Sequence, residues 1–182
     1  GTTSTYGQFL RDIDKTAAAL AARGVSTGDV MTVCLPNCPQ TLFAFYALNK
    51  LGAIASMIHP LSVSEEIRVF LGISALKCGF TPDAFWSRMA PALKGSTVKE
   101  AFLCRIQEFM PTVIKAGFWL TKGRKIKKVP SAAAVSWARL MKGANLSETV
   151  KPPADRDSKE MAVILYSGGT TGTPKGIMLS DW

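Results

Sequence analysis

Histidine is nearly absent from this chain of 182 residues, in which His59 is the only one. The four cysteines, Cys34, Cys38, Cys78 and Cys104, show no CxxC spacing. Because zinc sites are built mainly from cysteine and histidine at short spacings, we expect no metal held by the protein's own side chains. We interpret the cysteines as free, mostly buried thiols in a reducing cytoplasm.

Long apolar runs are also lacking. Each apolar stretch is broken by Lys, Asn, Gly or Pro well before about 18 residues, so we expect no membrane-spanning helix. The chain opens on Gly1 without a Met and without a charged-then-apolar leader, which predicts no signal peptide. This opening, together with an end at Trp182 soon after the most distinctive motif, favours a piece of a longer protein.

Acidic residues are the scarcer charged class, with 13 against 22 Lys and Arg, which gives a net charge of +9. Such a balance suits a polyanionic partner, an anionic membrane or a phosphorylated substrate. No nucleic-acid-binding motif accompanies the charge, so no nucleic-acid partner is expected. Hydrophobic residues make up 47% and charged residues 19%, which is typical of a folded domain.

Helices and short apolar strands alternate along the first 104 residues. Thr5-x-x-Gln8 and Ser62-x-x-Glu65 have the spacing of capping boxes, which predicts a helix start at each. Pro39 is suited to the first turn of another helix. The expected helices cover residues 6–21, 39–51, 62–71 and 83–93, and the expected strands cover residues 30–35, 53–58, 77–80 and 98–104.

This alternation implies βαβ crossovers, and so an α/β fold with a mainly parallel sheet flanked by helices. The chain divides by pattern into a βαβ-type core (1–104), an irregular basic segment with a linker (105–159) and a strand pair around a loop (160–182). His59 precedes Pro60 at the end of an expected strand, which favours a turn over a catalytic role.

The basic segment allows two interpretations. Apolar anchors beside cations suit contact of residues 109–128 with an anionic membrane surface. The alternative is a solvated basic excursion whose aromatic residues cover the sheet, and we favour it because Gly117 and Gly123 interrupt the pattern. A short helix is expected over residues 132–141. The pattern consists of Phe109, Ile114, Phe118, Trp119 and Leu120, followed by Lys122, Arg124, Lys125, Lys127 and Lys128.

The most informative stretch follows an apolar strand at residues 161–166 and precedes a second strand at residues 177–179. Its glycines let the main chain approach a phosphate without a Cβ in the way, and its hydroxyls and one ammonium are donors to an anion. A solvated glycine-rich hairpin is the plain alternative. Because a strand follows, this is not a Walker loop, which needs a helix. The candidate phosphate-binding residues are Ser167, Gly168, Gly169, Thr170, Thr171, Gly172, Thr173 and Lys175.

The stretch YSGGTTGTPKG (residues 166–176) resembles the signature of the adenylate-forming, or AMP-binding, enzymes: acyl-CoA synthetases, luciferases and the adenylation domains of peptide synthetases. TYGQFL, GVSTGDVMTVCLPNCPQ, LNKLGAIASMIHPLSVSEEI and IMLSD resemble that family in order and spacing. The Ser-Gly-Gly-Thr-Thr-Gly form is similar to bacterial long-chain fatty-acid–CoA ligases. Gly168 stands where many members have Ser or Thr, and Asp181 where many have His.

The resemblance implies the large N-terminal domain of an ATP-dependent ligase. Such an enzyme uses ATP and Mg²⁺ to activate a carboxylic acid, here a fatty acid, as an acyl-adenylate, and then transfers the acyl group to coenzyme A. It implies that Lys175 and Thr170 are catalytic and grip the β- and γ-phosphates. Two other interpretations remain: an adenylation domain that delivers its acyl group to a carrier protein, and a non-catalytic phosphate- or membrane-surface-binding module. The family also carries catalytic motifs further along the chain, and these are not found in this sequence. We therefore expect the 182 residues alone to lack ligase activity.

Overall fold

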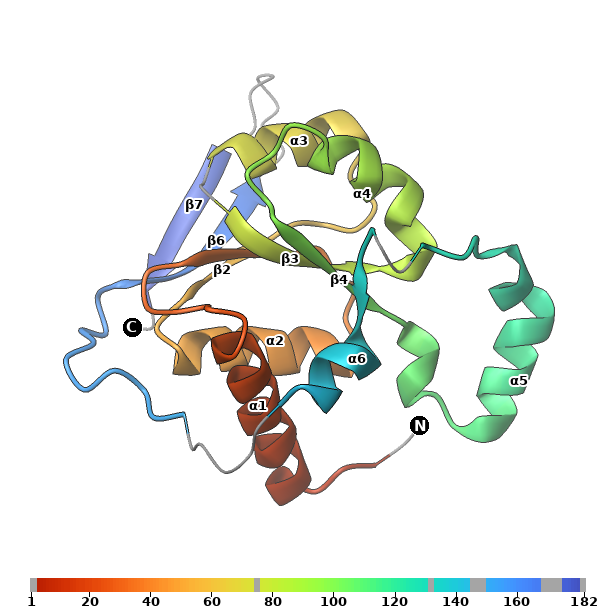
Figure 1. Cartoon of the computed structure of the whole chain (residues 1–182), viewed down its shortest axis with the longest axis horizontal. Helices are drawn as coiled ribbons and strands as arrows, with labels where there is room; N and C mark the ends of the chain where they lie inside the picture. The colour runs from red at the N-terminus through yellow and green to blue at the C-terminus, as the bar shows by residue number, and fades with distance from the viewer. Residues whose placement is uncertain (1–2, 74–75, 131–132, 145–149, 168–174, 181–182) are drawn as a thin grey trace.

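The computed structural model of the chain describes residues 3–73, 76–130, 133–144, 150–167 and 175–180. Within them, seven strands form one sheet in the order β5-β4-β3-β1-β2-β6-β7 (Figure 1). The strands are β1 (Val30–Val33), β2 (Ile54–Met57), β3 (Leu76–Pro82), β4 (Glu100–Cys104), β5 (Val135–Ser136), β6 (Met161–Ser167) and β7 (Lys175–Ser180).

Every neighbouring pair in the sheet is parallel except β6 and β7, which run antiparallel. The chain passes from β1 to β2 on one side and then returns to place β3 on the other side of β1. Such a reversal of strand order opens a crevice at the carboxyl ends of the strands. The expectation of a mainly parallel sheet flanked by helices is confirmed.

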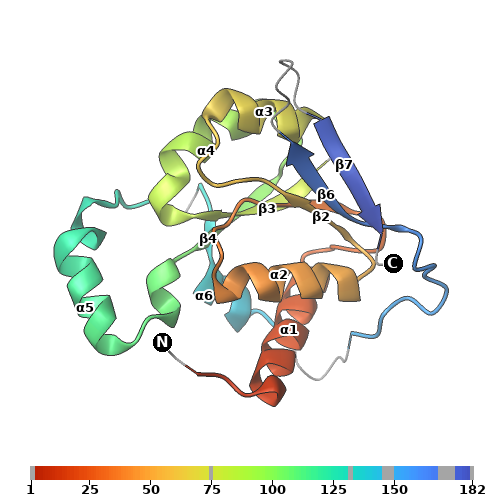
Figure 2. The same ribbon diagram turned by 180° about the vertical axis from the view of Figure 1, so that it is seen from behind.

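Helices form a layer on each face of the sheet, as Figures 1 and 2 show. One layer holds α1 (Tyr6–Ala21), α2 (Pro39–Lys50) and α6 (Trp137–Lys142), and the other holds α3 (Ser64–Ile73) and α4 (Trp86–Leu93). Helix α5 (Thr112–Thr121) stands to one side of both layers. Three short 3₁₀ turns are η1 (Asp83–Phe85), η2 (Ile106–Phe109) and η3 (Gly123–Lys125).

The starts of the first two helices follow the sequence signals. The Gln8 amide N–H donates to Thr5 Oγ1 at 3.2 Å, and the Thr5 N–H donates to Gln8 Oε1 at 2.9 Å, so the predicted capping box is present. Helix α2 begins at Pro39, and Gly52 follows its end at a φ of +70°. A residue with a Cβ rarely adopts that backbone conformation, which explains the glycine.

The predicted capping box of Ser62 and Glu65 is wrong by one residue. Helix α3 begins at Ser64, and the carboxylate that reaches back is that of Glu66, whose Oε2 accepts from the Val63 N–H at 3.3 Å. The Ser62 N–H instead closes the turn that follows β2. Because that turn extends one residue further than the spacing suggested, the helix starts later.

Each helical layer packs its own apolar core against the sheet. On the α1–α2–α6 face the Phe80 ring lies 5.2 Å from Phe102 and 5.7 Å from Trp137, measured between centroids. On the other face Phe70 and Met89 belong to the core beneath α3 and α4. The sheet is therefore buried on both faces over its central strands, as expected of parallel sheets.

The basic segment is more regular than its sequence suggested. Helix α5 was not expected, and the expected helix over residues 132–141 is instead strand β5 followed by α6, whose Ser136 cap accepts from the Arg139 N–H. The view that this segment's aromatic residues cover the sheet is correct for Phe109, which packs against Phe43, and wrong for Trp119, which is 58% exposed. In the described part of the chain, no helix is long and apolar enough to span a bilayer.

Candidate functional site

The last two strands bring the ends of the predicted phosphate loop together. In the antiparallel register Ser167 pairs with Lys175 and Tyr166 pairs with Gly176. Directly opposed residues send their side chains to the same face of a sheet, so the Ser167 hydroxyl and the Lys175 ammonium leave on one face. Lys175 is exposed and Ser167 is half-buried. A hydroxyl donor and a cation thus stand side by side where the loop begins and ends.

The middle of that loop lies outside the described residues. Of the predicted site, the structure therefore places Ser167 and Lys175 and brings them together. The predicted phosphate-binding roles stay predictions. The site residues outside the described part are Gly168, Gly169, Thr170, Thr171, Gly172 and Thr173.

Tyr166 fixes the strand end from which the loop leaves. Its hydroxyl lies 2.8 Å from Ser56 Oγ on β2 and donates to the Phe70 carbonyl oxygen of α3 at 3.3 Å. Its ring stacks on the Phe70 ring, with centroids 4.2 Å apart and an interplanar angle of 26°. Three elements are thereby joined next to the loop. Because the strand end is fixed, the neighbouring donors Ser167 and Lys175 lose little conformational freedom when they bind a ligand.

Gly176 lets the tyrosine ring lie against β7. A Cβ built on Gly176 would come within 3.2 Å of Ile164 Cγ2 and 3.5 Å of Tyr166 Cε1. The first distance is shorter than a comfortable contact between carbon atoms. The glycine that ends the signature therefore also allows β6 and β7 to pack closely at Tyr166.

A turn follows β2, and two half-buried carboxyl groups follow β3 and β4. His59 holds the turn after β2, where its carbonyl oxygen accepts from the Ser62 N–H at 3.0 Å, so the predicted turn role is confirmed.

Burial raises the pKa of Asp83, although the Ala84 backbone and the Arg105 guanidinium lower it. Burial also raises the pKa of Glu108, again against the lowering effect of Arg105.

The four cysteines are free and buried, as predicted. Burial raises the pKa of the Cys34 thiol to about 12 and raises the pKa of Cys104 well above its usual range. Thiolates, not thiols, are the reactive species, so neither side chain is suited to nucleophilic catalysis. Within the described ranges, no group of three or more His, Cys, Asp or Glu side chains could hold a metal ion.

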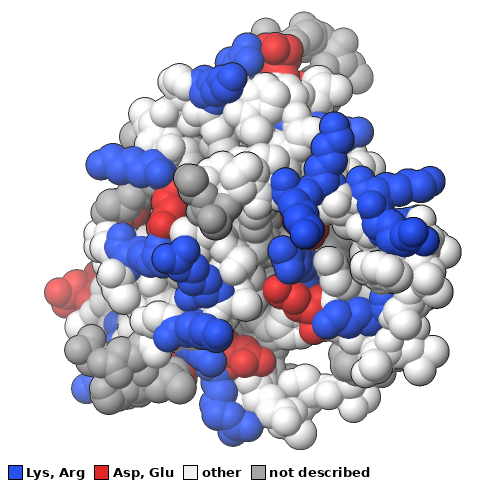
Figure 3. Space-filling model, turned by 45° about the vertical axis from the view of Figure 1, so that its right-hand side comes forward, with Lys and Arg blue, Asp and Glu red and all other residues white. Residues whose placement is uncertain are grey.

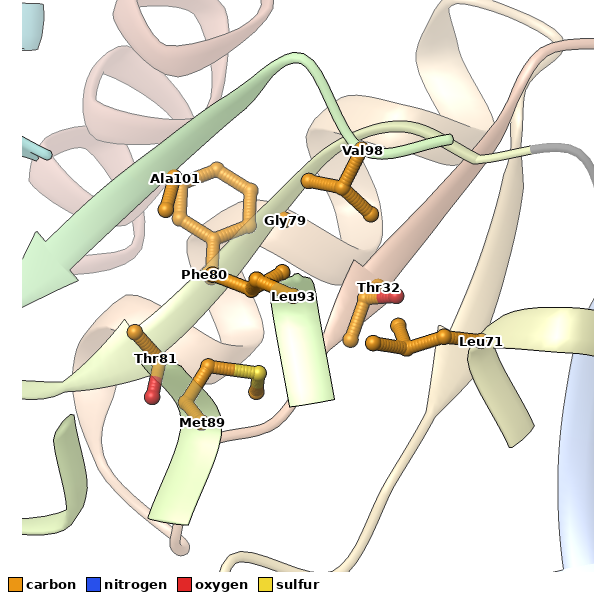
Figure 4. A pocket seen from close by; sticks show the side chains of 9 residues that line it. All are labelled: Thr32, Leu71, Gly79, Phe80, Thr81, Met89, Leu93, Val98 and Ala101. Atoms are coloured by element: carbon orange, nitrogen blue, oxygen red, sulfur yellow. The ribbon is translucent and has the colours of Figure 1, made fainter. Parts of the chain in front are cut away.

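One apolar cavity in the described part of the fold is too small for a substrate. It measures about 10 Å³ and lies between β3 and α4, where Gly79, Met89 and Leu93 line it (Figure 4). A volume of that order is at the lower limit for one water molecule. Two open hollows, of about 230 and 410 Å³, lie instead beside Asp83 at the carboxyl end of β3, with Lys127 and Lys128 on their walls.

The fold and the hairpin together define an α/β protein with a Gly- and Thr-rich loop between two sheet strands. The profile of one protein family, the AMP-binding enzymes, matches residues 1–181. The chain therefore belongs to the AMP-binding enzyme family. It is 30% identical over 178 residues to the long-chain-fatty-acid–CoA ligase of Bacillus subtilis (strain 168), and the match covers 97% of this chain and 32% of that protein.

Two solved structures have the same fold. An anthranilate CoA ligase in complex with anthranoyl-AMP superposes with a TM-score of 0.77 at 17% identity, over 97% of this chain and 30% of that one. A long-chain-fatty-acid–CoA ligase from Archaeoglobus fulgidus gives a TM-score of 0.69 at 24% identity, over 100% of this chain and 32% of that one. The chain thus spans about a third of the length of these relatives.

Sequence reasoning missed the support beneath the loop. In the sequence Tyr166 stands out only as part of the signature, because its partners Ser56 and Phe70 are 110 and 96 residues away. The available signal was a polar-tipped aromatic residue at the end of a buried strand, since such a hydroxyl usually finds a partner.

Proposed function

We propose that the protein containing this chain is an acid–thiol ligase that activates a carboxylic acid with ATP. The carboxylate attacks the α-phosphate to give an acyl-adenylate and pyrophosphate, and the thiol of coenzyme A then takes the acyl group and releases AMP. The main support is the hairpin end, where Ser167 and Lys175 face the same side at the limits of a Gly- and Thr-rich loop. That donor set fits a phosphate group.

The loop's part in this reaction is positioning and charge neutralisation. In the proposal Lys175 and Thr170 are catalytic because they hold the departing pyrophosphate, while Ser167, Thr171 and Thr173 add hydroxyl donors and the glycines add backbone N–H groups. Mg²⁺ would enter with ATP and neutralise phosphate charge. Tyr166 keeps the strand end in place while the loop binds.

We further propose a fatty acid as the substrate, coenzyme A as the acceptor and the cytoplasm as the compartment. The name of the Bacillus subtilis relative supports the first two. The four free thiols support a reducing compartment. Acyl transfer to a carrier protein is the alternative. Measuring which acceptor forms the thioester, coenzyme A or a phosphopantetheine-bearing carrier protein, separates the two.

The test is pyrophosphate exchange into ATP by the complete protein, with a fatty acid present. We expect Lys175→Ala to slow exchange by about a hundredfold or more, because removing one donor to a developing charge costs that much in enzymes. Lys99→Ala removes an exposed cation elsewhere and is the control. Exchange by the Lys175 variant at the unaltered rate, with the fold intact by circular dichroism, contradicts the proposed role.

A second candidate function is peripheral contact with a membrane surface through residues 109–128. One observation favours it: helix α5 has no buried residue although most of its side chains are apolar. This contact requires neither ATP nor the phosphate loop, so it stands or falls separately from the ligase reaction.

A further inference from the structure

Helix α5 combines an apolar composition with the absence of any buried residue. Lys115 is the one charged residue among its ten, and apolar side chains surround most of the helix axis. A helix of that kind in a folded protein is normally buried, yet this one has no buried residue. The exposed fraction is 84% for Val113, 54% for Ile114, 58% for Trp119 and 62% for Leu120.

The helix is also separate from the cores of the protein. No residue of α5 belongs to the apolar clusters found in the described chain. It stands beside the two helical layers in both views of the fold (Figures 1 and 2). Its apolar surface therefore contributes little to folding, and a partner outside the described residues is needed to remove it from water.

The charge next to α5 indicates which partner. Residues 112–128 include six Lys and Arg and no Asp or Glu. Lys122, Lys127 and Lys128 are exposed, and the Arg124 guanidinium lies 5.4 Å from the centre of the Trp119 ring. On this side of the molecule Lys and Arg side chains stand close together (Figure 3). Apolar side chains and cations thus share one surface.

An anionic bilayer matches both features at one boundary. Its acyl region accepts apolar side chains, its headgroup level suits a tryptophan ring, and its phosphates attract Lys and Arg. A protein partner would need an apolar groove and a separate group of carboxylates to do the same. The charge pattern therefore favours lipid.

We propose that α5 and the basic residues 122–128 form a docking surface for an anionic phospholipid bilayer. Trp119 and Leu120 enter the boundary between headgroups and acyl chains, and the cations that follow the helix bind lipid phosphates. This inference rests on the membrane contact proposed above, names the lipid chemistry that drives it, and does not depend on the ligase reaction.

Vesicle flotation of the complete protein tests the surface. Vesicles of phosphatidylcholine alone are compared with vesicles that also contain phosphatidylglycerol. We expect flotation with the anionic vesicles, little with the neutral ones, and a loss at high salt. Because each Lys or Arg near an anionic surface contributes about fivefold to partitioning, Lys127→Gln with Lys128→Gln should weaken it about twenty-fivefold. Leu120→Ser should weaken it about tenfold.

Matched variants elsewhere show whether position matters. Lys94→Gln with Lys99→Gln makes the same charge change at exposed residues of another surface. Leu61→Ser removes a leucine that is 56% exposed, close to the value for Leu120. Both controls should float like the unaltered protein. Equal flotation of the α5 variants and their controls overturns the proposal, as does equal binding to neutral and anionic vesicles.

A thiol probe separates lipid from a protein cover. The four cysteines of this chain are buried, so a Leu120→Cys variant should take up more maleimide than the unaltered protein, and the difference reports position 120. We expect labelling in solution and protection by anionic vesicles. Protection without vesicles means that another part of the protein, or a second copy, covers α5, and it overturns the proposal. Pyrophosphate exchange in the same samples tests the ligase reaction independently.

Discussion

The hydroxyl of Tyr166 lies 2.8 Å from Ser56 Oγ and joins β6, one residue before its end at Ser167, to the neighbouring strand β2. The same hydroxyl donates to the Phe70 carbonyl oxygen, so β6 is also tied to helix α3. Position and direction of the strand end are thus set by contacts on the face opposite to Ser167 and Lys175.

Removing this hydroxyl should weaken the fold and disturb the loop together. Tyr166→Phe keeps the ring on Phe70 and loses two hydrogen bonds, which should lower the free energy of unfolding by about 1–3 kcal/mol. Urea unfolding measures the first effect, and the KM for ATP in the complete protein measures the second. We expect that KM to rise because the strand end is less well fixed.

The matched control is Tyr46→Phe, since Tyr46 is 46% exposed. In that variant the free energy of unfolding and the KM for ATP should equal those of the unaltered protein within experimental error. A Ser56→Ala variant and the double variant then give the coupling between the two hydroxyls. Additive effects of the single changes would contradict the importance of the 2.8 Å contact.

A methyl group at position 79 should destabilise the sheet. The Cβ of a Gly79→Ala variant would lie 3.0 Å from Thr32 Cβ on the neighbouring strand, which forces two buried strands apart. We expect a loss of about 1–3 kcal/mol in the free energy of unfolding, as for other overpacked cores. Urea denaturation of the two proteins provides the comparison.

Gly72→Ala is the control for that substitution. Gly72 lies in helix α3, and a Cβ there would meet no atom within 4 Å. Since alanine favours a helix over glycine by up to about 1 kcal/mol, this variant should be as stable as the unaltered chain or more so. Equal unfolding free energies for both alanine variants would show that the strands tolerate the methyl group.

The raised pKa of Asp83 predicts a stability that falls as pH rises. Its pKa in the folded state is above the ordinary 3.8, so the folded protein binds the proton more tightly than the unfolded chain does. Stability should therefore decrease from about pH 4 up to the raised pKa and level off beyond it. The raised pKa of Glu108 acts in the same direction.

Thermal unfolding at a series of pH values measures this effect. Asp83→Asn cannot titrate, so its melting temperature should depend less on pH over that window. Asp155→Asn, at an exposed position, should follow the unaltered protein. A steeper pH dependence in the Asp83 variant than in its control would mean that the Arg105 ion pair outweighs burial.

The 182 residues by themselves should form no acyl-CoA. The chain matches about a third of the length of its relatives, so the proposed reaction would draw on residues outside it. Incubation with ATP, Mg²⁺, coenzyme A and a fatty acid, followed by chromatography of the thioester, is the measurement. Product formation by this chain alone would require the catalytic groups to lie within it.

The sequence predicted the alternation of helices and strands because local signals decide such elements. Thr5 and Gln8 cap a helix with their own side chains, and Pro39 suits the first turn of another helix. These two signals can be recognised in the sequence without knowing the fold. The prediction for residues 105–159 was weaker, because helix α5 has neither a one-sided apolar pattern nor a cap hydrogen bond from a side chain.

By itself the sequence determined that a Gly- and Thr-rich stretch with one lysine separates two strands, since composition and spacing fix those parts of the chain. Only the tertiary structure decided that the two strands pair with Ser167 opposite Lys175, and that Ser56 and Phe70 hold Tyr166 beside them. Partners about a hundred residues apart leave no local pattern. They meet because the parallel sheet places β2, β6 and helix α3 next to one another.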